Sequence, residues 1–261
     1  MEYCLAEPNI NLFILGDIGK FGFDHEFQEV WIQTAEERIT GVILRYHDNL
    51  LVYSKDLDMD FGEVKTLLDT LHIRIISGKG MVMDRLHLLT AEQYTKRDMI
   101  FCELIDPSKL AEDTGGVTIA EGSDAMEIAK LYGEINEFAG LYASEVEVRH
   151  SQIANRIKSG EGIHLFIKQD GKMISHANSA AETDVSGMIG GILTVSEYRN
   201  RGLAGKVISA VCKNLAHRGK SACLFHDNPK ADGLFTRLGF RATNKWTILE
   251  KRMNQPGGSS S

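Results

Sequence analysis

The segment from Gly187 to Ala204 carries residue types well suited to binding an anion, in the order GMIGGILTVSEYRNRGLA. Its first part is apolar and β-branched up to Val195, which predicts a strand. Its last part, from Arg199 onward, precedes a stretch with helical periodicity. Glycine lets a backbone approach a ligand closely, and a helix N-terminus offers unpaired N–H groups and the positive end of the dipole. With two arginines beside it, this arrangement predicts a pyrophosphate site.

Two common phosphate-binding motifs are absent from the chain. Neither GxGxxG nor GxxxxGK[ST] occurs, which disfavours a Rossmann dinucleotide site and a P-loop. The pattern present is R-x-x-G-x-A, from Arg199 to Ala204. It resembles the acetyl-coenzyme-A signature of the GNAT N-acetyltransferase superfamily, Q/R-x-x-G-x-G/A. The sequence TVSEYRNRGLA is similar to the corresponding segment in the branch that contains glycine N-acyltransferase-like proteins.

A second match follows one helix and one strand later, which is the order found in that superfamily. Asn228 to Ala231 resembles its closing motif N-x-x-A, and Leu238 to Phe240 resembles the L-G-F that follows. The resemblance covers about residues 115 to 252. It implies an acetyl-CoA-dependent N-acetyltransferase that transfers an acyl group to a primary amine of a small molecule. The amine would attack the thioester directly in a ternary complex.

The resemblance also implies roles for individual residues. Backbone groups of Thr194 and Val195 would pair with the pantetheine arm, and an N–H near Val195 would polarise the acyl carbonyl. The N–H groups from Arg199 to Gly205 would hold the pyrophosphate, and Asn228 would contact the cofactor near the thioester. The implied cofactor contacts are Thr194, Val195, Arg199, Asn200, Arg201, Gly202, Leu203, Ala204, Gly205, Asn228 and Phe235.

The chain departs from the family pattern at Phe235. Many members have a tyrosine there, seven residues after the asparagine, which is thought to protonate the departing thiolate. A phenyl ring has no proton to give, although it can pack against the acyl end. Solvent or another side chain would then protonate coenzyme A. The alternative is a non-catalytic acyl-CoA-binding or regulatory protein, and a third interpretation is a protein–protein adaptor with vestigial folds.

A general base is also needed, because an amine is mostly ammonium at neutral pH. His226 is the first choice, since its ordinary pKa of about 6.5 suits the task. Glu182 and His176, on or after the preceding strand, are the alternatives. We expect no metal.

Patterning places these residues in the second of two domains. From residue 117 the expected order is β-α-α-β-β-β-α-β-α-β, with a helix from Leu203 to His217. The first half is expected to begin with strands, the first over Ile10 to Leu15, with a hairpin turn at residues 47–49 and a helix capped by Asp60. The fold class is therefore α/β with an α+β mixed sheet, as tandem GNAT-like domains. The expected domains are residues 1–112 (a degenerate GNAT-like domain), 113–253 (the acetyltransferase) and a flexible tail, 254–261.

Charge divides unevenly between these halves. The net charge of −7 is the sum of −9 over residues 1–112 and +2 over the remainder. Because residues 1–112 carry an excess of carboxylates, we hypothesise that this half favours a cationic acceptor amine. The apolar runs are only as long as strands, and no secretory signal is evident, which predicts a cytoplasmic protein. The four cysteines lie far apart in sequence, and we expect them to be reduced thiols. We expect neither a nucleic-acid nor a membrane partner, and a homodimer is left open.

Overall fold

The computed structural model describes residues 1–134 and 145–252, and the chain divides into two compact units. Unit 1 comprises Met1–Phe101, Phe225–Asp227 and Ala242–Ser261, and unit 2 comprises Cys102–Leu224 and Asn228–Arg241. The chain thus returns to unit 1 near its end. The expected tail, residues 254–261, lies outside the described residues, and the domain boundary expected at residues 112/113 stays a prediction.

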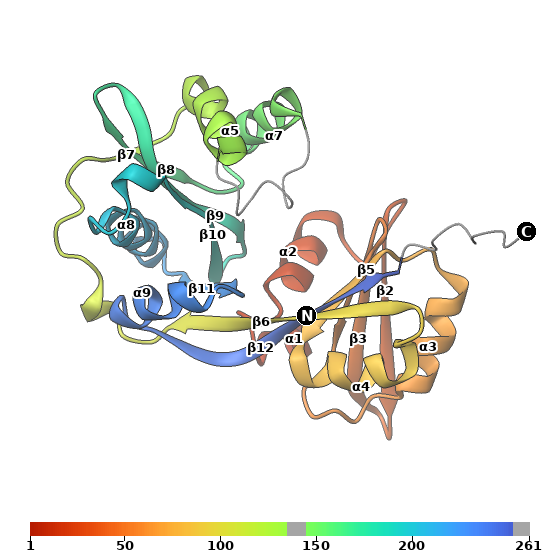
Figure 1. Cartoon of the computed structure of the whole chain (residues 1–261). Helices are drawn as coiled ribbons and strands as arrows, with labels where there is room; N and C mark the ends of the chain where they lie inside the picture. The colour runs from red at the N-terminus through yellow and green to blue at the C-terminus, as the bar shows by residue number, and fades with distance from the viewer. Residues whose placement is uncertain (135–144, 253–261) are drawn as a thin grey trace, which may run out of the picture. The chain divides into compact units, whose positions relative to one another are not determined.

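Unit 1 is built on strands in the order β1-β2-β3-β4-β5-β12-β6 (Figure 1). Their bounds are Asp24–His25, Gln28–Ala35, Arg38–Tyr46, Asn49–Tyr53, Ile75–Lys79, Phe240–Lys251 and Tyr94–Leu104. Neighbours are antiparallel from β1 to β4 and between β5 and β12, whereas β4 and β5 are parallel. Parallel strands need a crossover, and α3 supplies it. The helices are α1 (Glu2–Leu5), α2 (Leu12–Phe21), α3 (Phe61–Thr70) and α4 (Gly80–Thr90).

The strand expected at Ile10 to Leu15 is wrong, because α2 begins at Leu12. A short apolar run cannot by its period be told from a buried helix segment. The deciding signal lies further along the chain, where Ile18 continues the buried side of α2 with helical spacing. The predicted hairpin turn is confirmed between β3 and β4, where His47 has a φ of 52°.

Unit 2 has strands in the order β11-β10-β9-β8-β7. Their bounds are Ser221–His226, Ser186–Thr194, Lys172–Glu182, His164–Gln169 and Val117–Ile119. All neighbours are antiparallel except β10 and β11, which are parallel and joined through α8. The helices are α5 (Ala125–Glu134), α7 (Val146–Ser159), α8 (Leu203–His217) and α9 (Asp232–Arg237), and the short 3₁₀ turns are η1 (Pro107–Lys109), η2 (Gly122–Asp124), η3 (Ser196–Tyr198) and η4 (Pro229–Ala231).

Helix α8 confirms the helix predicted over residues 203–217. It packs against β8, β9 and β10 and buries one apolar face, which includes Val207, Val211 and Leu215. Helices α5 and α7 pack together, as Figure 1 shows, and form a core cluster with Phe166 and Leu193 of the strands. The expected mixed α/β class is thus confirmed. In the described residues, no helix is both long and apolar enough to cross a membrane.

Candidate functional site

Strands β10 and β11 separate soon after they begin. Residues 186–188 pair with 221–223, and no later pair joins the two strands within the described chain. Over residues 189–194, β10 therefore keeps β9 as its paired neighbour on one side only. An unpaired strand edge offers backbone N–H and C=O groups that an extended ligand can use.

The phase of the β9–β10 ladder shows which backbone groups face this open edge. The N–H of Val195 donates to the carbonyl of Ile174 over 3.0 Å. Residues in an antiparallel ladder alternate between bonded and non-bonded pairs. Thr194, opposite Ser175, therefore directs its backbone groups away from β9. Its carbonyl accepts a hydrogen bond from Nε of Arg199 at 3.0 Å, while its N–H faces the open edge.

Val195 does not fit the role expected for its backbone. Its N–H is bonded to Ile174, so it cannot also polarise an acyl carbonyl. Its own carbonyl accepts the N–H of Tyr198 at 2.9 Å, which closes the turn η3. Val195 therefore anchors the loop that follows β10, and any polarising N–H must come from another residue.

The loop from η3 to α8 has the backbone geometry of an anion site. Gly202 is the N-cap of α8 with a φ of 78°, and Asn200 also has positive φ, 62°. Both conformations are left-handed, which glycine adopts freely and asparagine tolerates. The first intrahelical bond of α8 joins the N–H of Lys206 to the carbonyl of Gly202. Glycine has no side chain to cap the helix, so the N–H groups of residues 203–205 have no intrahelical acceptor.

The two arginines of the motif brace this loop. The guanidinium of Arg199 bonds the carbonyl of Thr194, as described above. Nη2 of Arg201 donates to the carbonyl of Glu197 at 2.9 Å, and its guanidinium carbon lies 5.1 Å from the centre of the Tyr198 ring. Both side chains are exposed residues of the loop, so they add positive charge beside the start of α8 while they hold its shape.

His176 lies in the core of unit 2. It is fully buried, and its Nδ1 is 2.8 Å from the carbonyl oxygen of Gly191. Burial lowers the pKa of His176 to about 4, although the bond to Gly191 works in the opposite direction. A buried imidazole with so low a pKa is a weak base, and its Nδ1 proton is already engaged. This geometry argues against direct deprotonation of an amine by His176.

Glu182, at the end of β9, is held in an ion-pair cluster. Its carboxylate lies 2.6 Å from Nη1 of Arg218 and 2.7 Å from Nζ of Lys220. Burial by itself would raise the pKa of Glu182, but hydrogen bonds from Arg218, Lys220 and Ser179 outweigh it and lower the pKa. A carboxylate stabilised in this way is a poor proton acceptor, and its contacts explain it as part of the scaffold.

The remaining expected residues lie near the end of β11 and beyond. His226 is the last residue of β11 and falls in unit 1, whereas Asn228 falls in unit 2. Oδ1 of Asn228 caps the turn η4 by accepting the N–H of Lys230 at 3.0 Å. Phe235 is buried on α9, and its ring meets that of Phe240 edge-on at 6.1 Å between centroids. Phe235 is therefore a packing residue in unit 2.

One feature of the site was not expected from the sequence. Strand β10 bulges where residues 191 and 192 lie opposite the single residue Ala177 of β9. Gly191 has a φ of 55°, and a Cβ there would lie 1.8 Å from the hydroxyl of Tyr132. The available signal was the Gly190-Gly191 pair inside a strand, which often marks a bulge.

Comparisons with known proteins identify the fold. A family model described as FR47-like protein matches residues 152–248. An acetyltransferase of the GNAT family from Colwellia psychrerythraea superposes with a TM-score of 0.61 at 14% identity, covering 95% of this chain and 96% of its own. A GCN5-related N-acetyltransferase from Sphaerobacter thermophilus gives 0.61 at 17% identity, covering 95% and 92%. A tandem GNAT protein from the clavulanic acid biosynthesis pathway gives 0.58 at 12% identity, covering 95% and 94%. No curated protein sequence matches.

The chain has the GNAT acyl-CoA N-acyltransferase fold. Within that fold, the parallel pair β10–β11 and its crossover helix α8 have a counterpart in unit 1, which is the pair β4–β5 with α3. The counterpart strands stay paired through Val52 and Gly78, close to their ends. A Cβ at Gly78 would lie 2.3 Å from the carbonyl oxygen of Val52. Unit 1 therefore has no open strand edge at this point.

The helix start also differs between the two units. Helix α3 is capped by Asp60, whose Oδ1 accepts the N–H groups of Gly62 at 2.7 Å and Glu63 at 3.2 Å. The loop before it adds two more carboxylates, Asp56 and Asp58. Helix α3 thus carries its own anion where α8 has glycine, and this loop would repel a pyrophosphate.

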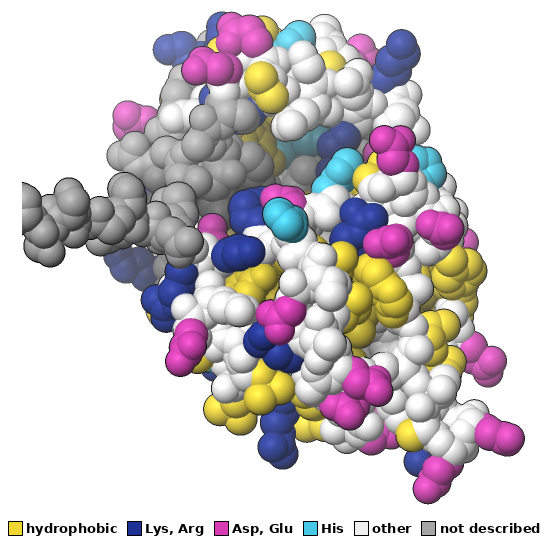
Figure 2. Space-filling model, turned by 90° about the vertical axis from the view of Figure 1, so that its right-hand side faces the viewer, with side chains coloured by type: hydrophobic (Ala, Val, Ile, Leu, Met, Phe, Trp, Pro, Cys, Tyr) yellow, Lys and Arg dark blue, Asp and Glu magenta, His cyan; other side chains and the backbone are white. Residues whose placement is uncertain are grey.

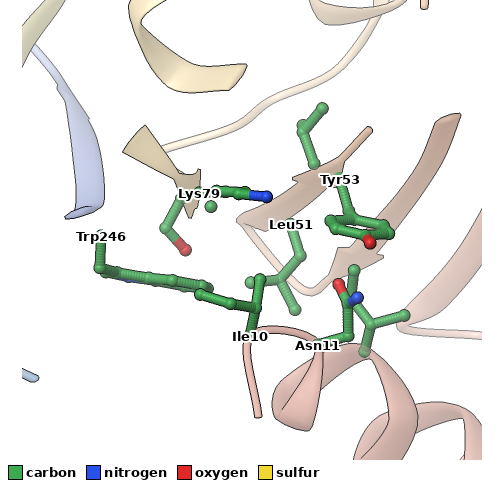
Figure 3. Close-up of a pocket in the computed structure, with 10 residues that line it drawn as sticks. Ile10, Asn11, Leu51, Tyr53, Lys79 and Trp246 are labelled. Atoms are coloured by element: carbon green, nitrogen blue, oxygen red, sulfur yellow. The ribbon is translucent and has the colours of Figure 1, made fainter. Parts of the chain in front are cut away.

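The ends of β4 and β5 border a small cavity, which lies within unit 1 (Figure 3). Its lining includes Ile10, Leu51, Tyr53, Lys79 and Trp246, and its volume is about 10 Å³. This is room for about one water molecule. Glu7 completes the polar side, because its carboxylate accepts Nζ of Lys79 at 2.8 Å and the hydroxyl of Tyr53 at 2.9 Å. The N-terminal segment thus supplies a carboxylate beside the ends of β4 and β5.

Proposed function

We propose that this protein is an acetyl-CoA-dependent N-acetyltransferase that acylates a primary amine of a small molecule by direct attack. One observation carries the proposal. Helix α8 begins at a left-handed Gly202 without a side-chain cap, one loop after a strand that has lost its β11 partner. The uncapped helix start suits a pyrophosphate, and the open strand edge suits the amide groups of a pantetheine arm.

The residues present fit acetyl-CoA on two counts. Among the described residues, no atom other than those of the chain neighbours lies within 4 Å of the position of a Cβ on Gly202, so these residues leave the space beside the helix start open. The backbone of Thr194 faces the open edge of β10, as the ladder phase indicates. The N–H groups of residues 203–205 would hold the pyrophosphate, and Thr194 would align the arm. When acetyl-CoA is bound, its thioester would supply the activated acyl group.

The proposed proton transfers involve few side chains. His226 is proposed as the base, since Glu182 is held by Arg218 and Lys220 and His176 is buried in a hydrogen bond. Phe235 offers no proton, so solvent would protonate the thiolate. These roles derive from residue chemistry and the position of His226 at the end of β11.

Unit 1 is proposed to be a degenerate copy that supports the active one. Its helix start is neutralised by Asp60, and its strand pair stays closed. We propose that it helps to select the amine, but its negative charge is a weak guide to the acceptor. On the face shown in Figure 2, acidic side chains are interspersed with basic ones rather than gathered in one patch.

A second candidate function is binding of acyl-CoA without transfer. Two observations favour it, the phenyl ring of Phe235 in place of a proton donor and the engaged N–H of Val195. Both functions require the cofactor site, and they differ in turnover.

The deciding experiment measures coenzyme A binding by calorimetry and thiol release from acetyl-CoA across a panel of neutral, acidic and cationic amines. The proposed function predicts binding and amine-dependent thiol release. Binding without release for any amine would favour the second candidate. Absence of both would refute the cofactor site at α8.

A further inference from the structure

Two buried histidines in unit 2 form a directed hydrogen-bond chain. His164 on β8 is 3% exposed and His176 on β9 is 0% exposed. Nδ1 of His164 lies 3.0 Å from Nε2 of His176, and Nδ1 of His176 lies 2.8 Å from the carbonyl oxygen of Gly191. The two rings are tilted with 5.2 Å between centroids.

The carbonyl at the end of this chain determines where the protons are. A carbonyl only accepts, so Nδ1 of His176 must carry the proton that it donates to Gly191. Nε2 of His176 is then an acceptor, so Nδ1 of His164 must carry the proton between the rings. Both rings are neutral in this arrangement. Burial supports neutrality, since it lowers the pKa of His176 to about 4 and that of His164 to about 3.

The group held by the chain is the β10 bulge. Gly191 is the left-handed residue of that bulge, and the ring of Tyr132 packs edge-on against His176 at 5.6 Å between centroids. Its hydroxyl leaves no room for a side chain on Gly191. The bulge is therefore enclosed by Tyr132 on α5 and tied to β9 by His176. Bulges bend a strand and re-aim its neighbours, and they are frequent next to active sites.

The position of the bulge along β10 gives it a role in acyl transfer. It lies after the three residues that pair with β11 and before Thr194, where the cofactor loop begins. A pyrophosphate held at the start of α8 would leave the pantetheine arm to run back along β10. Its thioester end would then approach the bulge.

We propose that His176 is a positioning residue for the acyl end of the cofactor, acting through the carbonyl of Gly191, and that His164 holds His176 in the required tautomer. The expected effect on kcat rests on the proposed function. The hydrogen-bond chain itself is seen in the structure and does not depend on that function. Neither histidine touches the reacting atoms. They hold the bulged backbone of β10 in one conformation.

The test compares two replacements of each histidine. Asparagine can place its side-chain N–H where Nδ1 of histidine lies, whereas leucine cannot donate. His176→Leu should lower kcat about tenfold to a hundredfold, since a misplaced reacting group costs that much, with the KM for acetyl-CoA within about threefold. His176→Asn should retain most of kcat. If His176→Leu does not fold, His164→Leu and His164→Asn test the same chain with the same expected order.

Phe166→Leu is the matched control, because Phe166 lies opposite His176 on β8 in the same core and makes no bond to the bulge. It should lose stability but keep kcat. A folded His176→Leu protein with normal kcat, or an equal loss in His176→Asn, would overturn the proposal.

A spectroscopic readout separates this proposal from the proposed function. In ¹⁵N NMR spectra of the full chain, both histidines should show the neutral form protonated at Nδ1. The opposite tautomer at His176 would refute the chain whatever the activity. If the tautomers are as expected but wild-type protein neither binds nor turns over acetyl-CoA, the proposed function fails while the hydrogen-bond chain stands.

Discussion

Replacing Gly202 with alanine should separate the cost to folding from the cost to cofactor binding. Gly202 has a φ of 78°, and alanine in a left-handed conformation is disfavoured by about 1 to 2 kcal/mol. The residues that the structure describes, apart from the two chain neighbours, have no atom within 4 Å of the new Cβ, so they add no clash to this cost. The free energy of unfolding should therefore fall by about 1 kcal/mol. Any relaxation of the loop would also move the N–H groups of residues 203–205.

Gly219→Ala is the matched control, just beyond the other end of the same helix. Gly219 also has a positive φ, 74°, and apart from its chain neighbours no atom of the described residues lies within 4 Å of its Cβ position. Alanine there should therefore lower the free energy of unfolding by about 1 kcal/mol as well. The two substitutions thus have the same expected cost to folding, but only Gly202 lies at the proposed pyrophosphate site.

Calorimetry with coenzyme A and denaturant unfolding measure both effects. Gly202→Ala should weaken coenzyme A binding about tenfold, which corresponds to about 1.4 kcal/mol, and Gly219→Ala should leave it within about threefold. If Gly202→Ala loses stability but binds coenzyme A like the wild type, the helix start is not the pyrophosphate site.

Three further predictions concern the side chains of Glu182, of His226, and of the pair His164 and Asn178. Glu182→Gln should lower the free energy of unfolding at pH 7 by about 1 to 3 kcal/mol and leave kcat unchanged. The pKa of Glu182 is lowered in the folded protein, so the ionised carboxylate stabilises the fold above the unfolded pKa, and this stabilisation is lost as pH falls through the folded pKa. The difference in free energy of unfolding between wild type and Glu182→Gln should therefore shrink in acid. A difference that stays constant with pH would contradict this. His226→Ala should lower the rate of thiol release and change its pH dependence, and an unchanged rate and pH–rate profile would exclude His226 as the base. His164 and Asn178 are cross-strand neighbours, and Nε2 of His164 and Oδ1 of Asn178 have no hydrogen-bond partner within the described residues. A high-resolution crystal structure should therefore show a buried water bonded to both atoms. Direct hydrogen bonding between the two side chains would contradict this prediction.

The sequence predicted those parts of the site that depend on local chemistry. Helix α8 has its predicted bounds because its apolar periodicity is strong. The left-handed backbone at its N-cap agrees with the presence of a glycine, Gly202, just before the helix. The predicted packing of Phe235 against the acyl end stays a prediction, since the contact seen in the structure is the one with Phe240. Such features depend on a few neighbouring residues, which a single sequence displays.

Features that depend on strand register could not be predicted in this way. The N–H of Val195 was available in the sequence-based hypothesis, but pairing with Ile174 engages it. His164 and His176 are twelve residues apart, and their contact requires the register of β8 on β9. Helix α2 was missed for a different reason, because its first apolar residues fit a strand equally well.

Within one chain, two strand–helix–strand units with the same topology therefore differ in what they can bind. In unit 1 the strands stay paired to Val52 and Gly78, and Asp60 occupies the start of α3 with its own carboxylate. In unit 2 the strands part after Met188, and Gly202 leaves the start of α8 uncapped. An anion gains from a helix start only where no built-in carboxylate already uses it. Exchanging Asp60 for glycine would remove one obstacle in unit 1, yet the closed β4–β5 pair would still exclude the arm of the cofactor. Both conditions are met together in unit 2, which is why we propose the acyl-CoA site there.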